Sequence, residues 1–274
     1  MTPKGRIIII RSTDTDTTDE AEHRSASHHF PSKIFALLSE EKNARIEIIT
    51  TSKDSTENCR KPYAELLEKD GYSNIGFIDI GKQDPDDYYS RISEAKVVMF
   101  DDNEQQICER LKNSAILKLL NKKYLHEDNF TVVGINTGAM CLSVLNDTGT
   151  INPGLGFINN CIIDTKFMHG ERCKNLVKAT IYHNECLGLG LKNGMALIIE
   201  KGYKAICLGN SSVMVVNAKD VKNKRLTRGS SVYKKNLKGH ILTEGSVLNL
   251  LNGDLIKTHL FGHSLNFINR NTIQ

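Results

Sequence analysis

Three features that are scarce in this sequence narrow the kind of protein it can be. Only five of the 274 residues are proline and 39% are hydrophobic, so the chain can bury a full core and is not disordered. The only early apolar run, residues 7–10, is far too short for a signal sequence or a membrane span, and we expect neither. Seven scattered cysteines form no C-x-x-C pair, which favours reduced thiols in a cytoplasmic protein.

A strong excess of one charge is also missing. The net charge of +4 is too small to imply a nucleic-acid partner, and we expect neither nucleic acid nor a membrane as partner. Eight basic residues gather in the segment 219–238, where Asp220 is the only acid. Such a segment most often forms a solvated hairpin, and a patch for an acidic peptide or nucleic acid is the alternative.

Strand-like and helix-like apolar patterns alternate over the first 150 residues. A short β-branched run bounded by polar residues is typical of a central parallel strand. The expected strands are 6–10, 46–50, 74–80, 96–100 and 131–135, and the expected helices are 30–39, 62–69, 84–95 and 105–120. Residues 11–29 are polar, lack periodicity and are expected to form a mobile loop. The βαβα order predicts an open α/β sheet, mostly parallel, with helices on both faces.

The pattern changes after about residue 150. Short strands separated by Gly and Asn are expected at 161–164, 195–200, 205–208, 213–217 and 239–242. No Pro/Ser-rich linker separates the two halves of the sequence. We therefore expect an antiparallel continuation of the same domain, which is a single domain over residues 1–274.

Residues 131–143, TVVGINTGAMCLS, have the layout of a nucleophile elbow, in which a strand turns sharply into a helix. Small residues flank the turn, which lets the backbone bend and lets the helix approach the sheet. Cys141 and Ser143 are expected inside that helix as packed side chains. The residue at the tip is Asn136, and an amide is not a nucleophile. Ligands of open sheets bind at the carboxyl ends of strands, so the elbow and residues 101–105 are expected to face one crevice.

Four blocks of the sequence, in order, resemble cyanophycinase and the aspartyl dipeptidase of the dipeptidase E type, which are serine peptidases. The family patterns are F-x-G-G-N-Q, G-T-S-A-G-A, G-L-G-L…D-Q-H-F…R and G-I-G-I-D-E, and the similar blocks here are 100–105, 134–139, 154–172 and 188–193. The resemblance covers roughly residues 95–250. It implies a doubly wound sheet of the class I glutamine amidotransferase-like type, no metal or cofactor, and a homodimer.

The three catalytic positions of that family are changed in this chain. Aligning the blocks puts Asn136 at the serine, Lys166 at the histidine and Asn193 at the acid. A triad needs a hydroxyl whose proton is taken by a histidine that a carboxylate orients, and loss of one member costs about 10⁴-fold in rate. Thr137, one residue past the tip, is the alternative nucleophile beside Lys166, or the donor of an oxyanion N–H.

Other polar side chains of the expected crevice are candidate ligand-binding groups. They are Asp101, Asp102, Asn103, Gln105, Asp164 and Arg172. Lys166 and Arg172 suit an anionic group, whereas Asp101 and its neighbour suit a basic one. Two His–Cys pairs, at positions 169/173 and 183/186, have a spacing that zinc could use. Neither pair forms a tight-turn knuckle, so we expect no metal.

The sequence therefore predicts a peptidase homologue that has lost serine-protease turnover and binds a peptide or small charged ligand in the cleft. Two alternatives stay open. One is an active hydrolase of aspartyl peptides, such as β-Asp-Arg, that works by an altered mechanism through Thr137 or Lys166. The other is an interaction protein that uses the basic segment 219–238.

Overall fold

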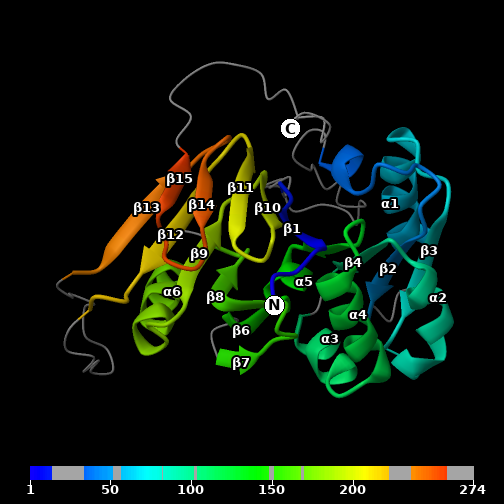
Figure 1. Ribbon diagram of the computed structural model, residues 1–274, viewed down its shortest axis with the longest axis horizontal. Coiled ribbons are helices and arrows are strands. Elements are labelled where there is room, and N and C mark those ends of the chain that lie inside the picture. The colour runs from blue at the N-terminus through cyan, green and yellow to red at the C-terminus, as the bar shows by residue number, and fades with distance from the viewer. Residues whose placement is uncertain are drawn as a thin grey trace, which may run out of the picture.

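The structure is a computed structural model that describes residues 1–13, 34–51, 57–81, 83–101, 104–147, 151–167, 170–221 and 236–257 (Figure 1). Two sheets form its framework. One has nine strands in the order β15-β14-β11-β10-β1-β5-β4-β2-β3, and the other has six strands in the order β13-β12-β9-β8-β6-β7. The two sheets share one hydrophobic core, in which Leu189 and Val215 of the second sheet join Leu197 of the first.

Five strands rich in Ile and Val form the parallel half of the nine-stranded sheet. They are β1 (Arg6–Arg11), β2 (Ile46–Thr50), β3 (Ile75–Asp79), β4 (Val97–Asp101) and β5 (Thr131–Ile135). The four isoleucines of β1 are fully buried and alternate between two clusters on opposite faces of the sheet. Burial on both faces is the pattern of a central parallel strand, and the predicted α/β class is confirmed.

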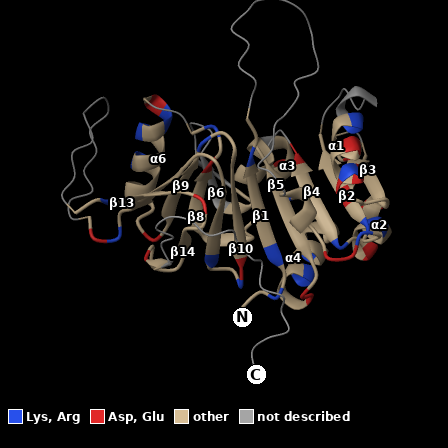
Figure 2. Ribbon diagram, turned by 90° about the horizontal axis from the view of Figure 1, so that it is seen from above, with Lys and Arg blue, Asp and Glu red and all other residues tan. Residues whose placement is uncertain are grey.

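Helices cover both faces of the parallel half. On one face lie η1 (Phe35–Leu37) and α1 (Glu57–Lys69), and on the other lie η2 (Pro85–Tyr88), α2 (Tyr89–Glu94), α3 (Glu104–Leu111) and α4 (Ala115–His126). Figure 2 shows basic and acidic positions interspersed along α1, which is the pattern of a solvated helix face.

Several predicted helices have different bounds. The predicted helix 105–120 is two helices, because Asn113 adopts a left-handed φ of 66° and Ser114 then caps α4, its Oγ accepting a hydrogen bond from Leu117 N at 3.0 Å. The predicted helix 84–95 divides into η2 and α2. The predicted helix 62–69 begins earlier, at Glu57, and contains Pro62. Of the predicted helix 30–39, the described part holds only the short turn η1.

Four antiparallel strands extend the nine-stranded sheet beyond β1. They are β10 (Met195–Glu200), β11 (Lys204–Gly209), β14 (Val247–Asn249) and β15 (Leu255–Lys257). The first of them pairs with β1, and Met195 stands opposite Arg11. The turn before β10, which holds Asn193, is thereby brought to the carboxyl end of β1.

The second sheet is not what the sequence predicted. Its strands are β6 (Ser143–Asp147), β7 (Ile151–Pro153), β8 (Ile158–Asp164), β9 (Leu187–Leu191), β12 (Val213–Asn217) and β13 (Lys238–Leu242). The predicted antiparallel extension is not antiparallel throughout, because β8 runs parallel to both β6 and β9. A parallel pair requires a crossover, which α6 (Glu171–Tyr182) supplies between β8 and β9 while covering the outer face.

The helix after the elbow is much shorter than expected. α5 spans only Thr137–Met140, and Ser143 already begins β6. Cys141 and Ser143 are fully buried as predicted, but their placement inside a helix is wrong. The chain leaves the helix because the carbonyls of Cys141 and Leu142 accept hydrogen bonds from the backbone of the segment leading into β8, at 2.6 and 3.0 Å.

Candidate functional site at the elbow

The turn between β5 and α5 is sharp and strained. Asn136 joins the two elements with φ 48° and ψ −119°. Few residues other than glycine adopt a positive φ, and such conformations gather at active sites and ligand clamps. A nucleophile elbow has the same strand–turn–helix arrangement and presents the side chain at its tip.

Two glycines make the turn sterically feasible. A Cβ on Gly134 would lie 2.4 Å from Ala139 Cα, and a Cβ on Gly138 would lie 2.4 Å from the Phe100 carbonyl oxygen. Both distances are far below van der Waals contact, so either side chain would push α5 away from β5 and β4. The small residues of the motif therefore hold the helix directly on the sheet.

Arg11 connects the tip of the elbow with the turn before β10. Its Nη1 donates a hydrogen bond to Asn136 Oδ1 at 3.3 Å, and its Nε donates to Asn193 Oδ1 at 3.0 Å. Asn136 Oδ1 also accepts from the backbone N and the Oγ of Ser12, both at 3.0 Å. The positions aligned with the serine and the acid of the family triad thus lie on either side of one guanidinium.

The carboxyl end of β8 reaches the same place. The hydroxyl of Thr165 donates a hydrogen bond to the carbonyl oxygen of Asn136. Asp164 is fully buried, and its Oδ1 accepts from Lys166 N at 2.9 Å and from Arg172 Nη2 at 2.5 Å. Arg172 therefore compensates a buried carboxylate inside the protein, while the side chain of Lys166 is exposed.

The remaining predicted residues are placed as follows. Asp101 ends β4, is half-buried and stands in register with Ile135, the residue before the tip. Thr137 is only 7% exposed at the start of α5. Asp102 and Asn103 lie outside the described residues. Gln105 belongs to α3, and only its backbone is described.

Arg11 and Ser12 are the residues that the sequence analysis missed. Both were assigned to a polar loop, whereas Arg11 is the last residue of β1 and Ser12 is fully buried. The sequence did contain a feature that could have identified Arg11 as a site residue, because Arg11 directly follows four isoleucines of a predicted central strand. The rule that sites form at the carboxyl ends of parallel strands applies to this position as well.

Neither His–Cys pair is arranged as a metal site in the part of the chain that the structure describes. No group of three or more His, Cys, Asp or Glu side chains converges within the described ranges. Burial raises the pKa of the Cys186 thiol, which disfavours the thiolate that zinc requires. His183 Nδ1 lies 3.4 Å from Glu185 Oε1, and His169 lies outside the described residues.

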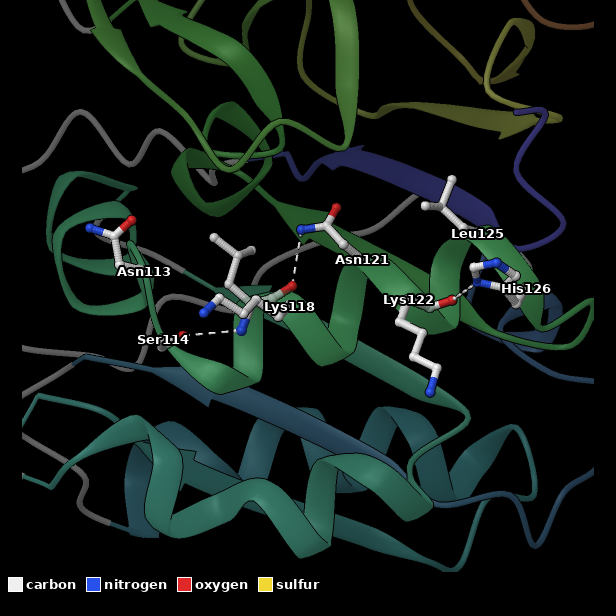
Figure 3. A pocket seen from close by; sticks show the side chains of 8 residues that line it. Asn113, Ser114, Lys118, Asn121, Lys122, Leu125 and His126 are labelled. Carbon is white, nitrogen blue, oxygen red and sulfur yellow. Dashed lines mark hydrogen bonds between the residues drawn. The ribbon is translucent and has the colours of Figure 1, made fainter.

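A cavity of about 490 Å³ lies on α4 (Figure 3), and none of its lining residues belongs to the elbow. Asn113, Ser114, Leu117, Lys118, Asn121, Lys122, Leu125 and His126 line it. Two of its polar groups are occupied by the helix itself, because Asn121 Nδ2 donates to Leu117 O and His126 Nδ1 lies 2.8 Å from Lys122 O. The polar groups of four segments converge at the elbow, so we place the candidate site there.

Comparison with known proteins finds sequence similarity to one kind of peptidase. No protein-family model matches the sequence. Over 115 residues the chain is 29% identical to the cyanophycinases of Synechococcus elongatus and Thermosynechococcus vestitus, a match that covers 40% of this chain. The chain spans about a third of the length of these curated relatives, 33% in each case.

Two solved structures share the fold. A peptidase from an acI-B1 Actinobacterium superposes with a TM-score of 0.60 at 15% identity, covering 90% of this chain and 98% of that one. A peptidase E-type protein of Listeria monocytogenes EGD-e superposes with a TM-score of 0.51 at 13% identity, covering 76% and 99%. The chain is thus similar in sequence to cyanophycinases and in fold to these two peptidase structures. The predicted family resemblance is confirmed, and the loss of the triad stays a prediction.

The mixed sheet, with helices packed on it, has the fold of these peptidase E-like structures. Within the described ranges, no helix has the length and apolar character needed to cross a membrane.

Proposed function

We propose that this cyanophycinase-like peptidase homologue binds a peptide or small charged ligand at the elbow and does not cleave it. The observation that carries the proposal is the contact between the elbow tip and a guanidinium. Asn136 stands where the family has its nucleophile, and Arg11 lies against it at 3.3 Å.

The chemistry of these groups supports binding without turnover. Acyl transfer needs a nucleophile and a neighbouring base that takes its proton. A guanidinium carries only donors, so Arg11 cannot act as that base. Asn193, the partner on its other side, is a neutral amide and cannot orient or charge-stabilise a base as a carboxylate does.

Charged groups around the elbow suit a charged ligand. Lys166 is exposed beside the site, and Arg11 adds a second cation. Asp101, at the end of the neighbouring strand, supplies an acid for a basic group. A ligand with both charges, such as an aspartyl-arginyl peptide, matches this set.

An active hydrolase of altered mechanism is the second candidate, because the matched relatives are a cyanophycinase and peptidases. Thr137 would be its nucleophile and Lys166 its base. Thr137 is largely buried, and a lysine base needs a desolvated ammonium whereas Lys166 is exposed. Both observations favour the binding function over this candidate.

We also propose the finer features that the family resemblance implies. They are a doubly wound sheet of the class I glutamine amidotransferase-like type, one domain over residues 1–274, and a homodimer in the cytoplasm. None of the six cysteines whose side chains the structure describes forms a disulfide, which suits a reducing compartment. An interaction role for segment 219–238 finds less support, because Lys238 already pairs with Asp220 at 2.6 Å.

The test is incubation of the protein with a β-aspartyl-arginine dipeptide. We expect calorimetric binding, arginine release no faster than in buffer, and no adduct with a serine-reactive phosphonate. Release of arginine that disappears in Thr137→Val would contradict the proposal and establish the hydrolase. Thr243→Val, on an exposed turn far along the chain, is the matched control and should change nothing.

A further inference from the structure

Helix α4 has basic residues on its exposed surface and no acidic ones. Its sequence, Ala115–His126, holds three lysines and a histidine but neither aspartate nor glutamate. Lys118, Lys122 and His126 are exposed and spaced four positions apart, so they form one basic row along the helix (Figure 3). Because an α-helix rises about 1.5 Å per residue, members of the row follow one another about every 6 Å.

The two lysines of the basic row form no ion pair with an acid of the described residues, and the nearest acids in the sequence are engaged elsewhere. The carboxylate of Asp86 accepts hydrogen bonds from two backbone N–H groups at the start of α4, both at 3.1 Å. Just past the end of the helix, Glu127 accepts from Lys123 at 3.0 Å, and Asp128 lies 3.9 Å from Lys4. The positive charge of the row is therefore not compensated within the part of the protein that the structure describes.

A half-buried strip runs beside the basic row. Leu117, Asn121 and Leu125 are also spaced four positions apart and line the same cavity of about 490 Å³. Leu117 packs in part against the main core, whereas Leu125 belongs to none of the core clusters of the described residues. The two leucines thus leave apolar surface at an open cavity, and a partner can cover it.

We propose that the α4 face formed by the basic row and the half-buried strip is a docking surface for an acidic amphipathic helix of another protein. Acids at positions i and i+4 of a partner helix repeat about every 6 Å, which matches the row, and the leucines receive the apolar residues between them. From Asn113 to His126 the surface is about 20 Å long, enough for three to four turns of a partner helix. A nucleic acid would use the cations but not the leucines, so the strip favours a peptide.

This inference does not depend on the proposed function, because none of its residues lies at the elbow. Charge complementarity would select the partner and its orientation, and the covered leucines would add affinity. Loss of dipeptide binding at the elbow would therefore overturn the proposed function and leave this inference standing.

The probe is a fluorescein-labelled, stapled helix of about 16 residues with leucines on one face and glutamates on both flanks. Its matched control peptide has glutamine in place of every glutamate. Binding to the full-length protein is measured by fluorescence anisotropy. We expect the glutamate peptide to bind at least about tenfold more tightly than the glutamine peptide.

The decisive variant is Lys118→Glu combined with Lys122→Glu. Both side chains are exposed, so the variant should fold, which its thermal melt will show, and it should bind the glutamate peptide at least about tenfold more weakly. Lys118→Arg with Lys122→Arg keeps the charge and should bind as the natural protein does. Lys61→Glu with Lys69→Glu makes the same charge change on exposed positions of α1 and should also leave binding unchanged.

Leucine substitutions test the apolar part of the surface. Leu125→Ala should weaken binding of the glutamate peptide several-fold. Leu251→Ala is the matched control, because Leu251 is 59% exposed and does not line the cavity, and it should have no effect.

The inference is overturned if the two peptides bind equally or not at all, or if the folded Lys118→Glu/Lys122→Glu variant binds undiminished. It is also overturned if single-stranded oligothymidine binds as tightly as the glutamate peptide, because the surface would then select polyanions in general. Analytical ultracentrifugation covers the remaining occupant. A dimer of the natural protein that becomes a monomer in the lysine variant would make this face an interface between two copies and would equally overturn the inference.

Discussion

Two clusters of hydrogen bonds in this molecule are built around arginine guanidinium groups, and they differ in the acceptors that the guanidinium groups contact. Near the edge of the nine-stranded sheet, Glu47 is fully buried and accepts from Arg45 at 2.8 Å and from two nitrogens of Arg91 at 2.6 and 3.0 Å. Gly76 of β3 leaves room for it, since a Cβ there would lie 2.3 Å from Glu47 Oε2. At the elbow, Arg11 instead holds two amide oxygens.

The difference lies in how charge is compensated. In the Glu47 cluster a buried carboxylate meets two guanidinium groups, so its negative charge is neutralised within the protein and the cluster is structural. At the elbow, Arg11 donates to two neutral amide oxygens and has a further interaction as well. The Glu47 cluster neutralises a buried charge, whereas the Arg11 cluster joins the tip of the elbow to the turn before β10.

Removal of Arg172 should have the largest effect, because it tests the structural support of the elbow. Arg172→Met leaves the buried Asp164 carboxylate without its cation, and breaking a buried pair costs about 3 kcal/mol of unfolding free energy. Urea denaturation measures this loss, and dipeptide binding should weaken because Asp164 also anchors Lys166 N. A loss below about 1 kcal/mol would show that Asp164 does not depend on Arg172.

Removal of Arg91 should have a smaller effect and none on ligand binding. Arg91→Met leaves Glu47 paired with Arg45, so we expect a loss of about 2 kcal/mol in urea denaturation. The control is Lys61→Met, which breaks the exposed pair with Glu65 at 4.0 Å and should cost less than about 0.5 kcal/mol. Reduced dipeptide binding in Arg91→Met would remove the distinction between the two clusters.

Tyr124 provides the smallest change at neutral pH. Its hydroxyl is buried without a hydrogen-bond partner in the described part of the chain, and burial raises its pKa to about 12. Tyr124→Phe should change the unfolding free energy by less than about 0.5 kcal/mol at pH 7, because no hydrogen bond is lost. Unlike the arginine variants, Tyr124→Phe should change the unfolding free energy appreciably only at high pH.

The alkaline effect follows from the raised pKa. The unfolded phenol ionises near pH 10 while the folded one stays protonated to about pH 12, so its stabilising effect is full below pH 10 and is lost as pH rises to 12. The loss amounts to about 2–3 kcal/mol. Urea denaturation at pH 9 and pH 11.5 should show a smaller drop for Tyr124→Phe than for the natural protein, and equal drops would refute the assignment.

The strands of the parallel half could be predicted because each is encoded locally. Residues 46–50 and 131–135 match the bounds of β2 and β5, since continuous β-branched runs satisfy a strand buried on both faces. The crossover through α6 could not be predicted in the same way. Short strands of similar composition serve parallel and antiparallel pairs alike, and the choice between them depends on distant partners.

The candidate site was predicted in part for the same reason. The turn at Asn136 is a local motif, and its small residues are needed for contacts within a few positions of the chain and with β4. Arg11 was missed because a polar residue before a long polar stretch resembles the start of a loop. Its partners Asn136 and Asn193 lie more than a hundred positions away, where only the pairing of β1 with β5 and β10 brings them near.

The sequence by itself determined the family resemblance, the alternation of strands and helices, and the presence of an amide at the tip of the elbow. These features depend on residue identity and on spacing over a few positions, where apolar periodicity and turn chemistry act. Only the tertiary structure decided that Arg11 lies between Asn136 and Asn193, and that Arg172 is engaged by Asp164. The sequence does not show which acceptor a distant donor will meet. The register of the sheet strands decides which of these groups lie together.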